Sequence, residues 1–163
     1  MLDRFHVSDD IAVRVPEAPM RATVEDIFRK MGMSDEDAIQ SADVLLYADV
    51  RGIDSHGVSN MLRQYVADFG AGHINPRPNW KIVREAPAIA NIDGDGGHGL
   101  VLGPAAMRIA IERAKLYGMG AVTVGNSKHS GAAAYHAAMA LEHGMVGLAM
   151  TTGSLNMAPT FAA

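Results

Sequence analysis

The chain of 163 residues is 48% hydrophobic and 20% charged, which is the balance of an ordinary globular protein. Its net charge of −4 at pH 7 excludes the basic surface that a nucleic-acid partner requires, and no run of 18 apolar residues is present to span a membrane. Cysteine is absent, which excludes disulfides and thiolate metal sites, and the first ten residues lack the apolar core of a secretory signal, so we expect a cytoplasmic protein.

The first 78 residues favour a small helical region. Residues 1–20 are mostly polar and contain two prolines, which predicts an extended lead-in. Thr23 belongs to the residue types that cap helices, and it predicts a helix over residues 24–31 that stops at Gly32.

Two further helices are predicted in this region. Ser34 is followed by three acidic residues, which complement the positive end of the helix dipole, and this helix should stop at Gly52. The third helix should run from about Val58 to Phe69, because apolar side chains recur there at spacings of three and four.

From residue 79 to residue 163 the pattern changes to that of an α/β region. Short β-like runs at 81–85 and 88–93 are followed by a helix that Pro104 should open. The later elements are a buried strand at 121–124, a small-residue helix at 131–143 and a strand at 146–151. This order predicts an α/β fold with at least part of a mixed or parallel sheet flanked by helices.

The Gly-rich stretch Gly94–Gly99 satisfies the G-x-G-x-x-G pattern of dinucleotide-binding loops. Two features argue against that function. The next helix is predicted to begin only at Pro104, and no carboxylate follows the next strand, where Asn126 stands, to hold a ribose. We favour a tight turn with several residues at positive φ, and phosphate binding remains the alternative.

Two histidine-bearing turns carry the more specific chemistry. The first is Arg51–Gly57, with His56, and the second is Gly125–Gly131, with His129. Each turn places a histidine among polar residues flanked by glycine, beside an apolar element. The two imidazoles, 73 residues apart, are therefore candidates for one shared cleft.

Ser55 beside His56 does not predict a hydrolase. Neighbouring side chains do not face one another on a strand or a helix, and the chain has no G-x-S-x-G elbow. Taken alone, the turn favours helix capping by Asp54 or Ser55, with a role in a site as the alternative.

The other histidines favour packing or surface positions. Those expected at the surface or in loops are His6, His73 and His98. Those that recur every seven residues, near one face of a helix, are His129, His136 and His143. Helical metal ligands usually lie four residues apart, so we expect no metal site, and a metal-dependent hydrolase remains a third alternative.

Ordered motifs run through the chain from about residue 20. They are Arg51–Val58, Tyr65, Gly72–Pro76, Ile92–Asp95, Gly103–Met107, Ala110–Ala114 and the loop from Asn126 to Gly131. Together they resemble the malate/L-lactate dehydrogenase family. The resemblance implies a small helical domain and an atypical, non-Rossmann nicotinamide-binding domain. It also implies NAD or NADP as cofactor, a 2-oxo or 2-hydroxy acid such as malate or lactate as substrate, and a homodimer or higher oligomer.

The resemblance also implies roles for individual residues. His129 matches the general acid/base, which suits imidazole because its unperturbed pKa of about 6.5 lies near working pH. Ser55 and His56 match the pair that contacts the substrate and the nicotinamide. The residues assigned to the cofactor side are Asn126, Ser127, Gly131 and Thr151.

The substrate carboxylate needs a cation, and arginine offers a bidentate fork. Many relatives place an arginine four residues after the motif histidine, where this chain has Asn60. We favour Arg63 for this role, with Arg51 as the second candidate. Ser130 stands where relatives carry a bulky apolar residue, a departure that can alter the shape of the pocket.

Members of the family are about twice as long as this chain. We therefore expect the chain to be a truncated N-terminal half, with part of the sheet and most cofactor contacts missing. The alternative to an active oxidoreductase is an inactive fragment that self-associates. An incomplete sheet leaves an open edge, and residues 146–150 would form it.

Overall fold

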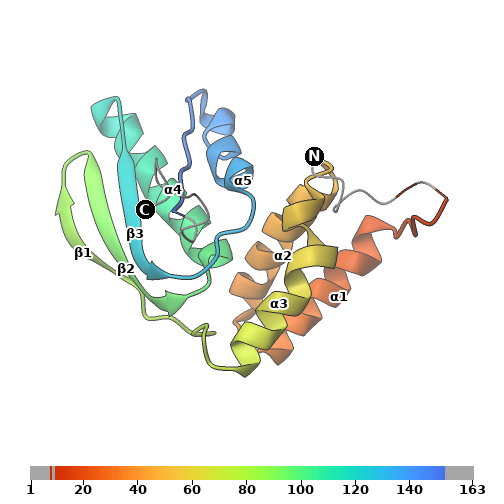
Figure 1. Cartoon of the computed structure of the whole chain (residues 1–163). Helices are drawn as coiled ribbons and strands as arrows, with labels where there is room; N and C mark the ends of the chain where they lie inside the picture. Colours follow the sequence, from red (N-terminus) through yellow and green to blue (C-terminus); the bar gives the residue numbers. More distant parts are fainter. Residues whose placement is uncertain (1–7, 9, 153–163) are drawn as a thin grey trace, which may run out of the picture.

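The computed structural model describes residue 8 and residues 10–152. In this part of the chain a group of helices lies beside a three-stranded sheet, and a long helix packs on one face of the sheet (Figure 1). The fold is therefore the α/β class that the sequence predicts. None of the described helices is long and apolar enough to cross a membrane.

Three helices make up the first part of the fold: α1 (Glu17–Lys30), α2 (Asp35–Asp49) and α3 (Val58–Gly70). The prediction of Ser34 as the start of α2 is confirmed, since its hydroxyl accepts a hydrogen bond from the Asp37 amide at 3.1 Å. The bounds of α2 and α3 agree with the sequence-based expectation to within about two residues.

The predicted start of the first helix is wrong. The helix begins at Glu17, directly after Pro16, instead of at residue 24. Pro19 fits in the first turn because the amide that proline lacks has no helical partner there. Thr23 lies inside the helix, where its hydroxyl donates to the Pro19 carbonyl at 2.8 Å and caps nothing.

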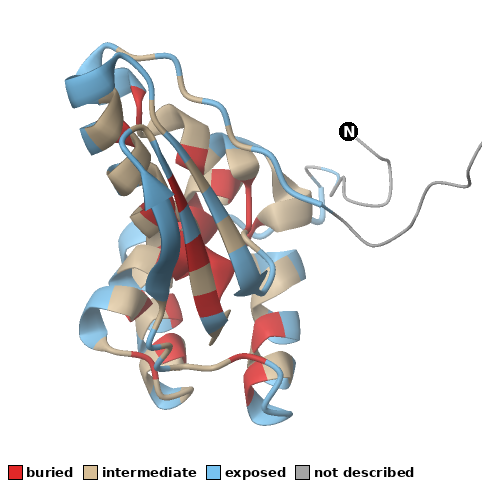
Figure 2. Cartoon of the chain, turned by 90° about the vertical axis from the view of Figure 1, so that its left-hand side faces the viewer, coloured by how far each residue is buried: buried red, intermediate tan, exposed pale blue. Residues whose placement is uncertain are grey.

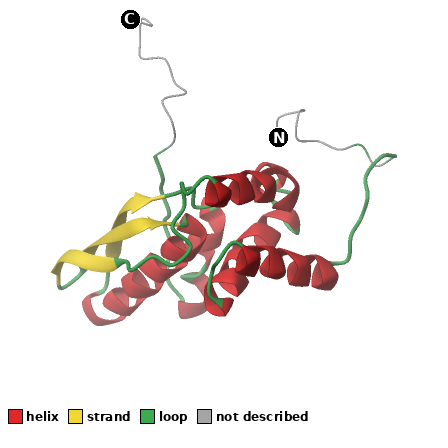
Figure 3. Ribbon diagram, turned by 90° about the horizontal axis from the view of Figure 1, so that it is seen from below, coloured by secondary structure: helices red, strands yellow, loops and turns green. Residues whose placement is uncertain are grey.

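The sheet contains β1 (Lys81–Ala86), β2 (Ile89–Gly97) and β3 (Ala121–Ser127), with β2 in the centre. Figure 3 shows the strands, in yellow, together on one side of the helices. β1 pairs with β2 antiparallel, and β2 pairs with β3 parallel, so the sheet is mixed. β3 was expected to be buried, but none of its residues is. Figure 2 shows the buried residues of the sheet gathered in the central strand, whereas β1 is exposed throughout and β3 has exposed and half-buried residues.

The helix α4 (Gly99–Tyr117) packs against β2 and β3. It begins five residues before the predicted start at Pro104, because the Nδ1 atom of His98 accepts a hydrogen bond from the Leu100 amide and caps the helix. His98 was expected at the surface or in a loop. It does lie in the short connection between β2 and α4, but the surface position is wrong, because the residue is only 1% exposed.

The helix predicted over residues 131–143 is much shorter. α5 spans Ala133–Ala138, and a separate 3-10 turn, η3, spans Leu141–His143. Gly144, at φ +66°, ends this segment. His129, His136 and His143 therefore do not share one helical face, because His129 lies before α5 and His143 lies after it.

The strand predicted at 146–151 is not present among the described residues. Alternate side chains there are strongly exposed, with Val146 98% and Met150 84% accessible. The alternating pattern is that of a strand, but the segment has no hydrogen-bonding neighbour in the described sheet. A strand needs such a partner as well as a pattern.

One apolar cluster joins the helices to the start of α4. Its buried members are Val24, Phe28, Met33, Ala38, Ala42, Val44, Leu45, Tyr65, Phe69, Ile74, Leu100 and Val101. Residues from α1, α2, α3 and α4 all contribute, so the helical region and the sheet region share a core.

The N-terminus of α3 is capped by Asp49, a residue that was not predicted to be a cap. The Asp49 carboxylate accepts a hydrogen bond from the Val58 amide at 3.0 Å, and burial raises the pKa of this carboxyl. Asp54 and Ser55, the predicted caps, lie in the 3-10 turn η2 (Asp54–His56), and neither side chain caps α3. A Cβ at Gly57 would lie 1.8 Å from Asp49 Oδ1, so the cap requires glycine at that position.

We therefore expect Asp49→Ala to lower the free energy of unfolding by about 1 kcal/mol or more, because the Val58 amide loses its acceptor. Chemical denaturation of both variants checks this, with Asp54→Ala as the matched control. The control should change stability by less than about 0.5 kcal/mol. Equal losses in the two variants would contradict the assignment of the cap to Asp49.

Candidate active site

A hydrogen bond between α3 and the loop after β3 forms the centre of the candidate site. The hydroxyl of Tyr65 lies 2.7 Å from Nδ1 of His129. The Gly131 amide donates to the same nitrogen at 3.2 Å. Nε2 of His129 makes no hydrogen bond to any residue that the structure describes, so this nitrogen is available to a ligand.

The second imidazole lies over the first. The rings of His56 and His129 are stacked, with centroids 5.4 Å apart and planes 22° from parallel. The Ser55 hydroxyl lies 2.8 Å from Nδ1 of His56. The two histidine-bearing turns therefore meet, and they place Ser55, His56 and His129 in one small region.

The loop that carries His129 is fixed by close packing. Gly131 has φ +71°, and a Cβ there would lie 2.6 Å from Leu100 and 2.8 Å from Val44. Nε2 of His136 lies 2.8 Å from the Ser130 carbonyl, to which it donates. The His136 ring in turn packs directly against Gly103, in the space that a side chain at this position would fill.

Electrostatics favour the neutral form of His129. Much of its ring is open to solvent, but its Nδ1 edge packs against Tyr65, and burial of this edge lowers the pKa of His129. The nearby His56 lowers the pKa of His129 further, because two imidazolium charges repel each other. Burial, assisted by Asp68, raises the pKa of the Tyr65 phenol, so Tyr65 keeps its proton.

The Tyr65 hydroxyl can form a hydrogen bond with Nδ1 of His129 whether or not Nδ1 carries a proton. The bond from the Gly131 amide favours the neutral tautomer in which Nδ1 accepts and the proton is on Nε2. When Nδ1 carries a proton, Tyr65 can accept that N–H while keeping its own hydrogen. Nε2 of the neutral His129 ring can accept a proton from a ligand only when the ring carries its own proton on Nδ1. The imidazolium that forms can then return a proton from Nε2 to the ligand.

The Gly-rich stretch does not form an open phosphate site, but it is not a separate turn either. Residues 94–97 are the irregular end of β2, whose register with β3 shifts between Asp93 and Gly97. The positive φ values expected of a tight turn are present within it, at Asp95 (φ +51°) and Gly96 (φ +68°). The argument from a late helix start is wrong, since α4 begins at Gly99. The amides there are nevertheless covered: a Cβ at Gly99 would lie 2.5 Å from the Lys128 carbonyl, and the Leu100 amide already donates to His98.

The residues assigned to the cofactor side are spread over this region. Asn126 has φ +48°, and its amide donates to Asp93 at 2.9 Å. Ser127 ends β3 and is exposed, and Thr151 is exposed beyond η3. No described hydrogen bond connects these side chains to His129. Their cofactor role stays a prediction, as does that of Gly131.

Neither candidate arginine has a described contact with His56 or His129. The Arg51 guanidinium lies 3.7 Å from the centre of the Tyr47 ring. Arg63 is exposed on α3 two residues before Tyr65, which places it about 200° around the helix from that side chain. Asn60 donates to the Asp54 carbonyl. The assignment of a substrate carboxylate to either arginine stays a prediction.

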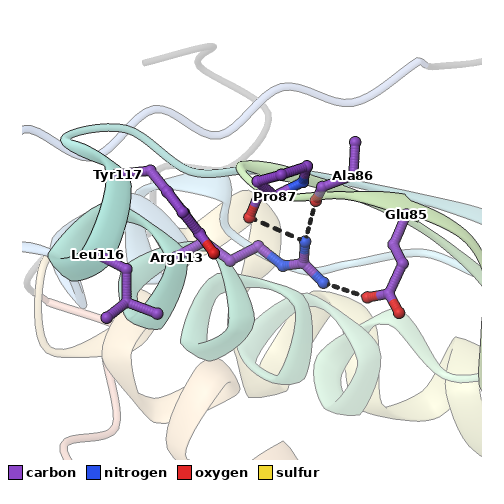
Figure 4. A pocket seen from close by; sticks show the side chains of 6 residues that line it. All are labelled: Glu85, Ala86, Pro87, Arg113, Leu116 and Tyr117. Atoms are coloured by element: carbon purple, nitrogen blue, oxygen red, sulfur yellow. Dashed lines mark hydrogen bonds and ion pairs between the residues drawn. The ribbon is translucent and has the colours of Figure 1, made fainter.

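An open depression beside Arg113 lies away from these residues (Figure 4). The Arg113 guanidinium donates to the carbonyls of Ala86, Pro87 and Ile89 and pairs with Glu85. Because these acceptors already engage its N–H groups, Arg113 braces the β1–β2 turn and is poorly placed to bind an anion.

The described residues contain no group of three or more histidine, aspartate or glutamate side chains that could hold a metal ion. The contact of Tyr65 with His129 was not predicted from the sequence, where Tyr65 belongs to the apolar stripe of α3. The stripe consists of Met61, Leu62, Tyr65, Val66 and Phe69. Tyr65 alone among these residues carries a hydroxyl, and a buried hydroxyl needs a partner.

Comparisons with known proteins agree on one family. The model of the malate/L-lactate dehydrogenase family matches residues 15–163. The chain is 46% identical over 160 residues to a malate dehydrogenase of Pyrococcus abyssi, an alignment that covers 98% of this chain and 44% of the relative. It is 43% identical over 134 residues to an L-sulfolactate dehydrogenase of Methanocaldococcus jannaschii, covering 82% of this chain and 39% of the relative.

A solved structure gives the same result. The malate dehydrogenase of Pyrococcus horikoshii superposes with a TM-score of 0.81 at 41% identity, covering 86% of this chain and 40% of that one. The chain thus spans less than half the length of the relatives that it matches.

We expect His56→Asn to raise the pKa of His129, because the variant removes a like charge and uncovers one face of the ring. An NMR titration of the His129 ring in the chain measures this. His73→Asn is the control, since His73 is an exposed histidine outside the stack, and it should leave the His129 midpoint in place. A lowered or unchanged midpoint in His56→Asn would show that the stack does not set the pKa.

We expect Tyr65→Phe to lower the pKa of His129. The imidazolium loses a charge-assisted acceptor for its Nδ1–H, whereas the neutral ring loses a weaker bond and keeps the Gly131 amide. The same titration measures the change. Tyr47→Phe removes a hydroxyl that bonds to Ala134 instead and should have no effect. A rise of the midpoint in Tyr65→Phe would contradict this account.

Proposed function

The chain belongs to the malate/L-lactate dehydrogenase family, and we propose from this premise that it is part of an oxidoreductase. The reaction exchanges a hydride between NAD(P)H and a 2-oxo acid, with malate or lactate as examples of the 2-hydroxy acid formed. The observation that carries the proposal is the pairing of His129 with Tyr65 beneath the stacked ring of His56.

In this proposal His129 handles the proton of the reaction. In the direction of reduction its Nε2–H protonates the alkoxide that develops on the substrate, and in the direction of oxidation Nε2 takes the hydroxyl proton. Tyr65 accepts the Nδ1–H in both cases. The lowered pKa of His129 increases the share of the neutral ring at neutral pH and makes the imidazolium a stronger acid. The neutral ring can accept the hydroxyl proton on Nε2 when its own proton is on Nδ1. NADH or NADPH, when bound, supplies the hydride.

The described residues do not fit a complete dinucleotide site. The N-terminus of α4 is covered and capped, so it offers no phosphate cradle. We propose that Ser55 and His56 bind the substrate and the nicotinamide, and that Asn126, Ser127, Gly131 and Thr151 border the cofactor. The relatives' names support hydroxy acids as the substrate class. Either Arg63 or Arg51 would bind the carboxylate.

We propose further that residues 1–78 form a helical region and residues 79–163 part of the nicotinamide-binding region. A cytoplasmic location fits the absence of cysteine. Association as a homodimer or higher oligomer fits the exposed apolar side chains Val146, Leu148 and Met150.

The test is oxidation of NADH and NADPH by the purified chain with oxaloacetate and pyruvate. A second protein joins the chain to the remaining part of the Pyrococcus abyssi relative. In whichever protein turns over, His129→Gln should lower kcat roughly 100-fold with little change in KM. His143→Gln, an exposed histidine on η3, is the matched control and should leave kcat unchanged.

Turnover by the chain alone would show that it is sufficient for catalysis. Turnover only in the joined protein would favour the alternative, in which this chain by itself is an inactive fragment that self-associates. Full activity of the joined protein with glutamine at position 129 would overturn the role of His129.

A further inference from the structure

His98 is a buried polar residue that neither the core nor the proposed reaction explains. Its Nδ1 atom accepts from the Leu100 amide at 3.1 Å, so a neutral ring carries its proton on Nε2. Nε2 is fully buried and has no hydrogen-bond partner in the part of the chain that the structure describes. An unpaired buried N–H is costly, and its retention calls for a reason.

Tyr65 is the aromatic residue that packs most closely against His98. The two rings are perpendicular, with centroids 4.4 Å apart and an angle of 89°. Phe28 and Phe69 also contact His98, at 6.3 and 5.7 Å between centroids. Among these aromatic neighbours, Tyr65 lies closest to His98, and its hydroxyl bonds to His129.

Neither simple explanation accounts for histidine at this position. Helix capping alone would be served by Ser, Asp or Asn, without a buried unpaired N–H. Packing among aromatic rings alone would be served by an apolar side chain. A neutral imidazole combines a cap on one nitrogen with a buried N–H on the other, in a ring that is surrounded by aromatic side chains.

We propose that His98 is a positioning residue for His129, and that its Nε2–H rests against the face of the Tyr65 ring and holds the Tyr65 hydroxyl on Nδ1 of His129. A ring N–H over an aromatic face is a weak but recognised contact. The inference rests on the proposed function, in which His129 exchanges the proton. His98 itself touches no reacting atom.

The charged and titratable groups near His98 agree with this role. Burial lowers the pKa of His98 to about 3, the nearby His129 lowers it further, and Asp68 opposes both. His73 lies 3.5 Å from Asp68 at the surface. His98 therefore stays neutral over the working range of pH, and its Nε2–H is a constant feature of the site.

Two substitutions of His98 distinguish the role of Nδ1 from the role of Nε2. His98→Asn keeps an oxygen where Nδ1 caps α4 but removes the N–H at the place of Nε2. His98→Gln keeps an N–H near the place of Nε2 but loses the capping atom. The readouts are an NMR titration of His129 and the thermal midpoint of the full chain, neither of which requires substrate or cofactor.

We expect His98→Asn to lower the His129 midpoint by about half a pH unit, since Tyr65 no longer holds its bond to Nδ1. His98→Gln should lower Tm by a few degrees and leave the His129 midpoint near its original value. In the Tyr65→Phe background, His98→Asn should have no further effect on the midpoint, because the two changes act through one contact.

The opposite pattern would overturn the proposal. A purely structural role predicts that the His129 midpoint follows stability, so that His98→Gln shifts the midpoint and His98→Asn does not. Equal shifts by His98→Asn in the unchanged chain and in the Tyr65→Phe background would also overturn the proposal, since His98 would then act independently of Tyr65. Because these measurements need no turnover, a failure of the dehydrogenase function would be seen separately.

Discussion

The contact between the Tyr65 hydroxyl and Nδ1 of His129 connects the two parts of this structure. The residues are 64 positions apart, one on α3 and the other in the loop that follows β3. The shared core places the two elements side by side, and the hydrogen bond fixes the edge of the imidazole that faces inward. The remaining nitrogen then faces outward, so the same contact that joins the regions also determines which atom can meet a ligand.

Burial of neutral polar rings gives the site its rigidity. Tyr65, His98 and His136 are all buried, and burial raises the pKa of the phenol and lowers those of both imidazoles. Groups that keep one protonation state keep one pattern of donors and acceptors. Against this fixed background, His129 is half open to solvent and can change its charge. A proton-transfer residue is most useful when its supports do not titrate with it.

The sequence predicts much of the scaffold but less of the site. The two histidine turns were found because glycine and polar residues around a histidine are visible in the sequence. The apolar stripe of α3 correctly predicts a helix, but a hydrophobic pattern does not reveal which partner the Tyr65 hydroxyl finds. The starts of α1 and α4 were misplaced for different reasons. Pro16 and Pro19 were taken as signs of an extended segment, whereas α1 begins at Glu17 and holds Pro19 in its first turn. Pro104 was taken as the first residue of a helix, whereas α4 begins at Gly99, after the His98 cap.

Strand prediction fails where pairing is decided by tertiary structure. Residues 146–151 alternate like a strand, yet the described sheet gives them no neighbour. The Gly-rich stretch shows the converse case, in which a motif lies in the right context but the site is closed. Its strand and helix are both present, but the Leu100 amide already donates to His98, and the loop that carries His129 packs against Gly99. The capping nitrogen of His98 thus closes an anion site, while its other nitrogen faces the aromatic cluster around Tyr65. His98 thus blocks phosphate binding at the N-terminus of α4 and, in our proposal, holds Tyr65 against His129. This double role explains how a pattern typical of dinucleotide binding can instead serve proton transfer.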